Sequence, residues 1–311
     1  KNVCVRIAIR KRFVKYKSTH TMRCRIEFYY FLIIALVLPK IVCGWGYDAH
    51  QRINWSAATI IPGVFGKYVR SNRQELTQYA VVADYIKSSD SKEAPRHYID
   101  ADLYDNFPFD SLSGSLDDLE SKYGKDVVEN WGYGPWAIDE TCSRVIYMLK
   151  NKRWDEAIFH MSTLGHYISD IHVPLHVVEN YNGQLTGNDG IHFRWEGRMV
   201  DEHVKSIRPT GPLPLVSGSV VDFSMNIVRE SYVTMQQILN ADTKARKLLS
   251  SSEQQQLNSY DILPFEGPYL QSLYDQTADL VQDRIEMAVL RIAAMWVYCW
   301  NEAGQPPPPK R

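Results

Sequence analysis

The sequence has few cysteines, and none of them lies in a metal-binding motif. Five cysteines occur in 311 residues, and three of them fall within the first 44 residues. No Cys-x-x-Cys pair is present, so a metal site in this protein must be built from histidine and carboxylate ligands. The other two, Cys142 and Cys299, could form one disulfide in an oxidising compartment, and the sequence leaves open whether they meet.

Patterns of three other kinds are missing as well. No long alternation of apolar and polar residues is present, and neither is an internal repeat or a Gly-x-Ser-x-Gly motif. The first absence argues against a fold built on a sheet, and the last against a serine hydrolase of the kind that carries this motif.

The apolar run 28–38 is too short to span a bilayer comfortably. No basic amphipathic helix follows it, so the sequence does not support membrane attack or insertion.

Residues 1–44 have the features of a secretory signal peptide. A basic segment (1–25) precedes the apolar run, and small residues end at Gly44, as signal peptidase favours. We expect cleavage there, with Met22 as a candidate start, so that a secreted chain begins at Trp45. The leader holds 10 of the 35 Lys and Arg and one of the 36 Asp and Glu, which leaves 25 bases, 35 acids and a formal net charge of −10. This charge weakens a nucleic-acid substrate without excluding it.

Helical periodicity dominates the rest of the chain, so we predict an all-α fold. We expect an extended segment at 94–100 and a loop at 180–190. One domain is predicted over 45–304, followed by a disordered proline-rich tail at 305–311. The predicted helices cover residues 50–61, 75–86, 116–129, 135–150, 155–171, 220–249 and 267–302.

The stretch from Gly165 to His176 carries the strongest functional signal. His166 and Asp170 are four residues apart, so they share one face of a helix. Pro174 cannot continue that helix, which should end near Ile171. His176 then lies just past the bend and can turn back toward the same face. Histidine and aspartate are ordinary zinc ligands, so the stretch predicts a metal site.

Other potential ligands lie outside this stretch. His192 and Glu196 repeat the spacing of four residues after a Gly- and Asn-rich loop. His97 follows a Pro-Arg pair, and Asp84 lies thirteen residues before it.

The predicted new N-terminus adds a ligand pair. After cleavage, Trp45 would offer its α-amine and its carbonyl oxygen, with His50 five residues further on. An α-amine has a pKa of about 7.7 to 8, low enough for a metal to displace its proton.

In this order, these residues resemble the ligands of the zinc-dependent phospholipase C and S1/P1 nuclease superfamily. The resemblance spans Trp45 to Glu196. It implies an all-helical, secreted phosphoesterase with three zinc ions. His160, His172 and His203 match no ligand position, and we expect them on the surface or behind the ligands. By position, one zinc would be held by Asp84, His97, His166 and Asp170, a second by His176, His192 and Glu196, and a third by Trp45, His50 and a bridging Asp170.

The resemblance also implies a mechanism. Water between the two zincs that share Asp170 would be acidified toward a pKa of about 7, and the resulting hydroxide would attack phosphorus in line. Asp84 would orient this nucleophile or accept its proton. The remaining zinc would neutralise charge on the phosphate and leaving-group oxygens.

The substrate is less well defined by the sequence. Glu196 and the short gap from His176 to His192 resemble the phospholipase C branch, whereas the short step from Trp45 to His50 resembles the nucleases. We therefore expect a monomeric phospholipase C-like phosphodiesterase for a phospholipid head group or a soluble phosphodiester. An S1/P1-like single-strand nuclease or 3′-nucleotidase is the alternative, and a non-catalytic zinc protein is the second.

Two further points stay open at this stage. One N-glycosylation sequon occurs at Asn54, close to His50. Aromatic residues that could contact substrate cluster upstream of the central stretch, although at least half of them would suit a core. They are Tyr104, Phe107, Phe109, Trp131, Tyr133 and Trp136.

Overall fold

A computed structural model describes residues 45–309 of the chain, except for 113, 205 and 258–262. The chain divides into two compact units, 1–41 and 42–311, and every described residue belongs to the second. The predicted signal peptide and its cleavage site lie outside the described residues. Within these residues no helix combines the length and the apolar character needed to cross a membrane.

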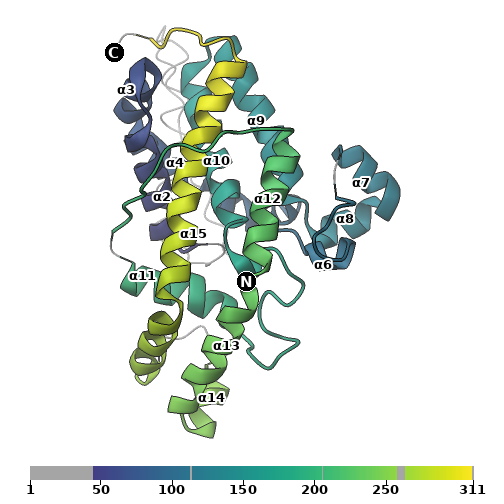
Figure 1. The fold of residues 1–311 in the computed structure, drawn as a ribbon, viewed down its shortest axis with the longest axis vertical. Coiled ribbons are helices and arrows are strands. Elements are labelled where there is room, and N and C mark those ends of the chain that lie inside the picture. Colours follow the sequence, from purple (N-terminus) through teal and green to yellow (C-terminus); the bar gives the residue numbers. More distant parts are fainter. Residues whose placement is uncertain (1–44, 113, 205, 258–262, 310–311) are drawn as a thin grey trace, which may run out of the picture. The chain divides into compact units, whose positions relative to one another are not determined.

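The described part of the chain contains helices and no strand, which confirms the all-α prediction (Figure 1). The first half holds α2 (Tyr47–Ile60), α3 (Gly63–Ser71), α4 (Arg73–Tyr79), α5 (Val82–Lys87), η1 (Ala94–Arg96), α6 (Ala101–Tyr104), α7 (Leu116–Tyr123), α8 (Lys125–Trp131) and α9 (Gly134–Lys150). The second half holds α10 (Trp154–Asp170), η2 (Pro174–His176), η3 (Phe193–Met199), α11 (Val200–His203), α12 (Val220–Tyr232), α13 (Met235–Ala245), η4 (Arg246–Leu248), α14 (Ser251–Gln256) and α15 (Glu266–Glu302).

Helix α10 lies at the centre of this unit. It packs against α2, α4, α9 and α15, and every residue from Leu164 to Asp170 is buried. The polar side chains in this segment, His166, Ser169 and Asp170, are therefore enclosed by the protein and must find partners inside it. In Figure 1 the long α15, drawn in yellow, runs past α10 and α2. The buried C-terminal end of α10 is where the predicted ligands lie.

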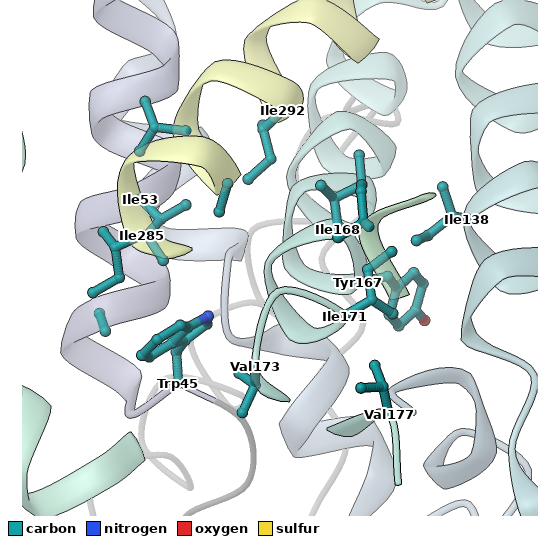
Figure 2. Close-up of a cluster of buried hydrophobic side chains, with 14 of the residues drawn as sticks. Trp45, Ile53, Ile138, Tyr167, Ile168, Ile171, Val173, Val177, Ile285 and Ile292 are labelled. Carbon is teal, nitrogen blue, oxygen red and sulfur yellow. The ribbon is translucent and has the colours of Figure 1, made fainter. Parts of the chain in front are cut away.

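The core continues up to this end of α10. Figure 2 shows Trp45, Ile53 and Ile285 together between α2 and α15, with Ile168 and Ile171 on the central helix. The side chain of Trp45 is fully buried, and its indole Nε1 donates to the carbonyl of Ser169 at 2.8 Å. This hydrogen bond therefore holds the segment that leads into α2 next to the residue before Asp170.

Helices α2 and α10 approach closely at Gly165. A Cβ at this position would lie 2.3 Å from Oδ1 of Asn54, so the contact requires glycine. The Asn54 amide is buried and donates to the carbonyl oxygens of Leu76 and Ser162. Because the sequon amide is enclosed and hydrogen-bonded, we expect no glycan on Asn54 in the folded protein.

Several predicted elements are interrupted in the structure. The helix expected at 75–86 breaks at Ala80 and Val81 into α4 and α5, and the one expected at 116–129 divides at Gly124, whose φ is 89°. The segment 220–249 forms α12, α13 and η4 instead of one helix. The prediction of an extended segment at 94–100 is wrong at its start, where η1 forms. Periodicity does not register breaks that tertiary hydrogen bonds or one left-handed glycine impose.

Two features near the C-terminus also bear on the predictions. The tail was expected to be disordered, but Pro306 is buried and its carbonyl accepts a hydrogen bond from Trp300 Nε1 at 2.9 Å. The beginning of the tail is therefore held against the end of α15. The buried sulfur atoms of Cys142 on α9 and Cys299 on α15 lie 3.3 Å apart.

Candidate metal centre

All eight side chains predicted as metal ligands come together in the structure. Three groups of His and carboxylate residues could each hold a metal ion within the described part of the chain. None of these groups contains His160, His172 or His203, as expected. The groups are His50, Asp84 and His166; His97, His166 and Asp170; and His176, His192 and Glu196.

The ligands come from six separate elements around the end of α10. Helix α10 itself supplies His166 and Asp170, and η2 supplies His176 after the bend at Pro174. Glu196 belongs to the π-helical η3 and His192 is the N-cap residue of that element, so the pair does not lie on one regular α-helix as its spacing suggested. The remaining three, His50, Asp84 and His97, lie on α2, on α5 and at the end of η1.

Three donors of the first predicted zinc site lie close together. Zinc ligands at 2.0 to 2.2 Å in tetrahedral geometry are about 3.3 Å from one another. The distances are 3.0 Å between Nδ1 of His97 and Oδ2 of Asp170, 3.0 Å between His97 Nδ1 and His166 Nε2, and 3.2 Å between His166 Nε2 and Asp170 Oδ2. Oδ1 of Asp84 lies 3.8 Å from each of these two histidine nitrogens. The donors of His97, His166 and Asp170 thus have the spacing of tetrahedral zinc ligands, and Asp84, which also groups with His50 and His166, lies further out.

The second group is similarly compact. Nε2 of His176 lies 3.3 Å from Oε2 of Glu196, and Nε2 of His192 lies 2.9 Å from its Oε1. Burial opposes ionisation of Glu196, but His192 and His176 outweigh it and lower its pKa to about 2. The carboxylate is therefore charged at neutral pH, as a zinc ligand must be.

Asp170 connects the first group to His50. While its Oδ2 faces His97 and His166, its Oδ1 lies 3.3 Å from Nε2 of His50. The His50 ring stacks on His166 with 4.0 Å between centroids. This arrangement suits a carboxylate shared by two metals. The backbone of Trp45 is the remaining predicted ligand, and its role stays a prediction.

Hydrogen bonds on the far side of three rings orient the nitrogens that face inward. Nδ1 of His166 donates to the Ala80 carbonyl at 2.7 Å, and Nδ1 of His176 to the His97 carbonyl at 3.0 Å. Ser169 Oγ donates to the His166 carbonyl, so it accepts from Nδ1 of His50 at 2.8 Å. In each case Nδ1 makes the outer hydrogen bond, so Nε2 is the nitrogen that can bind a metal once any proton on it is displaced. The break between α4 and α5 thus exposes the Ala80 carbonyl for this purpose.

Buried atoms without hydrogen bonds show that the site suits cations. Buried polar atoms in proteins almost always have a hydrogen-bond partner. Here the atoms without one include His50 Nε2, Asp84 Oδ1, Asp170 Oδ1, His176 Nε2, His192 Nε2 and both Glu196 oxygens. Donors this close that do not bond to one another are arranged to share a cation between them. The nitrogen and oxygen donor set fits zinc.

A cavity of about 380 Å³ opens beside these groups. His97, His176 and His192 form one wall, and Nζ of Lys87 lies 3.3 Å from Asp84 Oδ1 at its edge. The remaining lining residues include Tyr98, Asp100, Asn130 and Tyr181. Burial, together with Asp102 and Glu179, raises the pKa of Asp100 to about 8.

The expectation about substrate-contacting aromatics is wrong. None of the six predicted residues lines this cavity. Three of them, Tyr104, Phe109 and Trp136, are buried in the core, which agrees with the expectation that at least half would be core residues. The aromatic residues at the cavity are Tyr98 and Tyr181. Their positions in the sequence could have indicated them. Tyr98 directly follows a predicted ligand, and Tyr181 lies in the loop that precedes His192.

Comparison with known proteins gives two matches. A protein-family model described as S1/P1 Nuclease matches residues 46–206, a range that includes all eight ligand side chains and ends before α12. Nuclease S1 of Aspergillus oryzae (strain ATCC 42149 / RIB 40) is 25% identical over 184 residues, which are 54% of this chain and 58% of that protein. The chain therefore spans less than two thirds of this relative's length.

Proposed function

The chain belongs to the S1/P1 nuclease family, and we propose on this basis that it is a zinc-dependent phosphoesterase that cleaves the phosphodiesters of single-stranded nucleic acid or the phosphomonoester of 3′-nucleotides. The observation that carries the proposal is the convergence of eight His and carboxylate ligands beside one cavity. Its volume of about 380 Å³ lies within the usual range of small-molecule sites. The comparisons favour this reading over the phospholipase C-like one, which the sequence placed first.

The ligands would hold three zinc ions in the sets given by the sequence. When bound, these ions would supply activation of water for attack on phosphorus and neutralisation of the phosphate oxygens. Three Zn²⁺ ions would bring six positive charges against the carboxylates of Asp84, Asp170 and Glu196. With them bound, the site would attract a phosphodiester although the chain from Trp45 onward carries a formal net charge of −10.

The surrounding residues have roles of their own. Asp84 reaches the first group with one carboxylate oxygen, so it can orient a water molecule or accept its proton. Lys87 holds its ammonium 3.3 Å from Asp84, where it can bind a phosphate oxygen at the edge of the cavity. Tyr98 and Tyr181 offer aromatic surfaces on which a base can stack.

A phospholipase C-like activity is the second candidate. Glu196 as the last ligand favours it, because the nuclease branch usually ends on aspartate. The cavity does not decide against it, since Ala94, Leu175 and the rings of Tyr98 and Tyr181 line it beside Lys87, Asp100 and Asn130.

Parallel substrates separate these functions. Protein beginning at Trp45, loaded with zinc, is incubated with single-stranded DNA, a 3′-mononucleotide and phosphatidylcholine, and phosphate-ester hydrolysis is measured for each. We expect cleavage of the DNA or the nucleotide, and loss of activity with a chelator. Asp84→Asn is the control for contaminating nuclease. Faster hydrolysis of phosphatidylcholine would support the second candidate, and no hydrolysis of any substrate would support a non-catalytic zinc protein.

We also propose that the protein is secreted after removal of residues 1–44, and that 45–304 form its catalytic domain. The buried position of Trp45, whose indole donates to the carbonyl of Ser169, the residue before Asp170, supports this, because the new amine would arise near the predicted ligands. Mass spectrometry of the N-terminus of secreted protein tests it. A first residue other than Trp45 would contradict the proposal.

A further inference from the structure

His97 faces the metal centre with the opposite ring nitrogen from the other buried histidine ligands. His50, His166 and His176 present Nε2, whereas His97 presents Nδ1, which lies 3.0 Å from Asp170 Oδ2. If Nδ1 is to bind a metal, the ring proton must sit on Nε2. This atom points away from the other ligands and has no hydrogen-bond partner within the described residues.

Glu93 faces that nitrogen. Its Oε1 lies 3.6 Å from Nε2 of His97, four residues further along the chain. This distance is longer than a hydrogen bond, and a shift of about 0.5 Å would close it. The outer ring nitrogens of the other three buried histidines contact carbonyl or hydroxyl oxygens. Among these four histidines, His97 is the one whose outer nitrogen faces a carboxylate.

Glu93 is itself held in place. The Tyr167 hydroxyl donates to its Oε1, and Nε of Arg96 lies 3.7 Å from its Oε2. Only 13% of the Glu93 side chain is exposed. These contacts fix the Glu93 carboxylate beside the His97 ring, where one of its oxygens can accept a hydrogen bond.

Arg96 ties this arrangement to α9. Its guanidinium donates to Oε2 of Glu140 at 2.6 Å and to Oγ1 of Thr141 at 3.2 Å, while Nε donates to the Tyr167 hydroxyl at 3.1 Å. The Tyr167 ring also packs edge-on against His97, with 5.4 Å between centroids. Residues of η1, α9 and α10 therefore converge on Glu93, and none of them is a predicted ligand.

We propose that Glu93 is a positioning residue for the zinc centre: its carboxylate accepts the Nε2 proton of His97 and thereby fixes the tautomer and ring orientation that present Nδ1 to the metal. A carboxylate behind a ligating histidine also makes the histidine a stronger donor. Tyr167 and Arg96 serve to hold the carboxylate. The inference rests on the proposed function, because it requires that His97 bind zinc.

Zinc affinity of the full protein from Trp45 onward tests the inference. Dissociation constants for zinc are measured by competition with a chromophoric chelator for wild type, Glu93→Gln and Tyr167→Phe. Glu93→Gln keeps the shape of the side chain and removes its charge. We expect it to raise the dissociation constant of the zinc ion bound by His97 about 10- to 100-fold. Tyr167→Phe should have a smaller effect in the same direction. Asp90→Asn is the matched control, since it is the same chemical change on an exposed residue of the same loop.

Cobalt(II) provides a second readout that a purely structural role would not change. The visible absorption of cobalt bound at the His97 site should shift in Glu93→Gln, whereas the helical circular dichroism of the metal-free variant should match wild type. Equal zinc affinities and identical cobalt spectra for wild type and Glu93→Gln would overturn the inference, as would an equal loss in Asp90→Asn. If Glu93→Gln fails to fold, unchanged affinity in Tyr167→Phe also counts against it. Wild type that binds no zinc would overturn the proposed function as well, so the two failures are distinguishable.

Discussion

Replacing Asp170 with asparagine tests whether one carboxylate serves two metals. Asp170 is fully buried, with Oδ2 3.0 Å from His97 Nδ1 and Oδ1 3.3 Å from His50 Nε2. Asparagine keeps the shape but removes the charge that both groups share. Glu196→Gln is the matched control, because the Glu196 oxygens face His176 and His192 of a single group.

The structure sets the size of two effects. Burial opposes protonation of His166, but Asp170 and Asp84 outweigh it and raise its pKa to about 9. Relative to 6.5, this corresponds to a net stabilisation of protonated His166 by about 3 kcal/mol, after the cost of burial. Asp170→Asn should therefore cost the metal-free protein about 1 to 2 kcal/mol. Activity should fall much further, by at least about 10³-fold or about 4 kcal/mol, because two metal positions lose a ligand.

The assay is zinc content by mass spectrometry together with the initial rate on single-stranded DNA. We expect zinc to drop from three ions to about one per chain in Asp170→Asn, and from three to about two in Glu196→Gln. Helical circular dichroism of both variants checks that the fold is retained. Equal losses of zinc and activity in the two variants would refute the bridging role of Asp170.

Three other predictions follow from the same site. Zinc binding at pH 7 should release protons, because the raised pKa keeps metal-free His166 protonated. The contribution of this protonation to the stability of the metal-free protein is present below pH 6.5 and is lost as pH rises through about 9. Calorimetry in buffers of different ionisation enthalpy checks this, and identical heats would contradict it. One extra residue before Trp45 should abolish activity and leave the helical content unchanged, and full activity in that protein would exclude the N-terminal chelate. Tyr181→Ala should raise KM for DNA by about 5- to 100-fold with little change in kcat or thermal stability, since 47% of Tyr181 is exposed; an unchanged KM would remove this residue from substrate binding.

The sequence by itself determined the fold class, and it singled out the eight side chains that the structure brings together. Pairs such as His166 and Asp170, or His192 and Glu196, are separated by one helical turn, so their proximity is a local property that periodicity reveals. The proline after His172 likewise fixes where α10 ends. Ligands far apart in the chain, such as Asp84 and His97, were found only because their order resembles that of a known family.

Tertiary structure decided how these residues are combined. That Asp170 faces His97 with one oxygen and His50 with the other depends on the packing of α2 and η1 against α10, and no local pattern encodes this packing. The same holds for the break that exposes the Ala80 carbonyl and for the 3.3 Å between the sulfur atoms of Cys142 and Cys299.

The residues that line the cavity were also identified only by the tertiary structure. Sequence composition pointed to the wrong aromatic residues, because burial of a side chain depends on contacts with segments remote in the chain. Glu93 was not singled out at all, although it lies four residues before His97. A carboxylate on a polar segment looks solvated in the sequence, and only the fold of α9 and α10 around it places it behind a metal ligand.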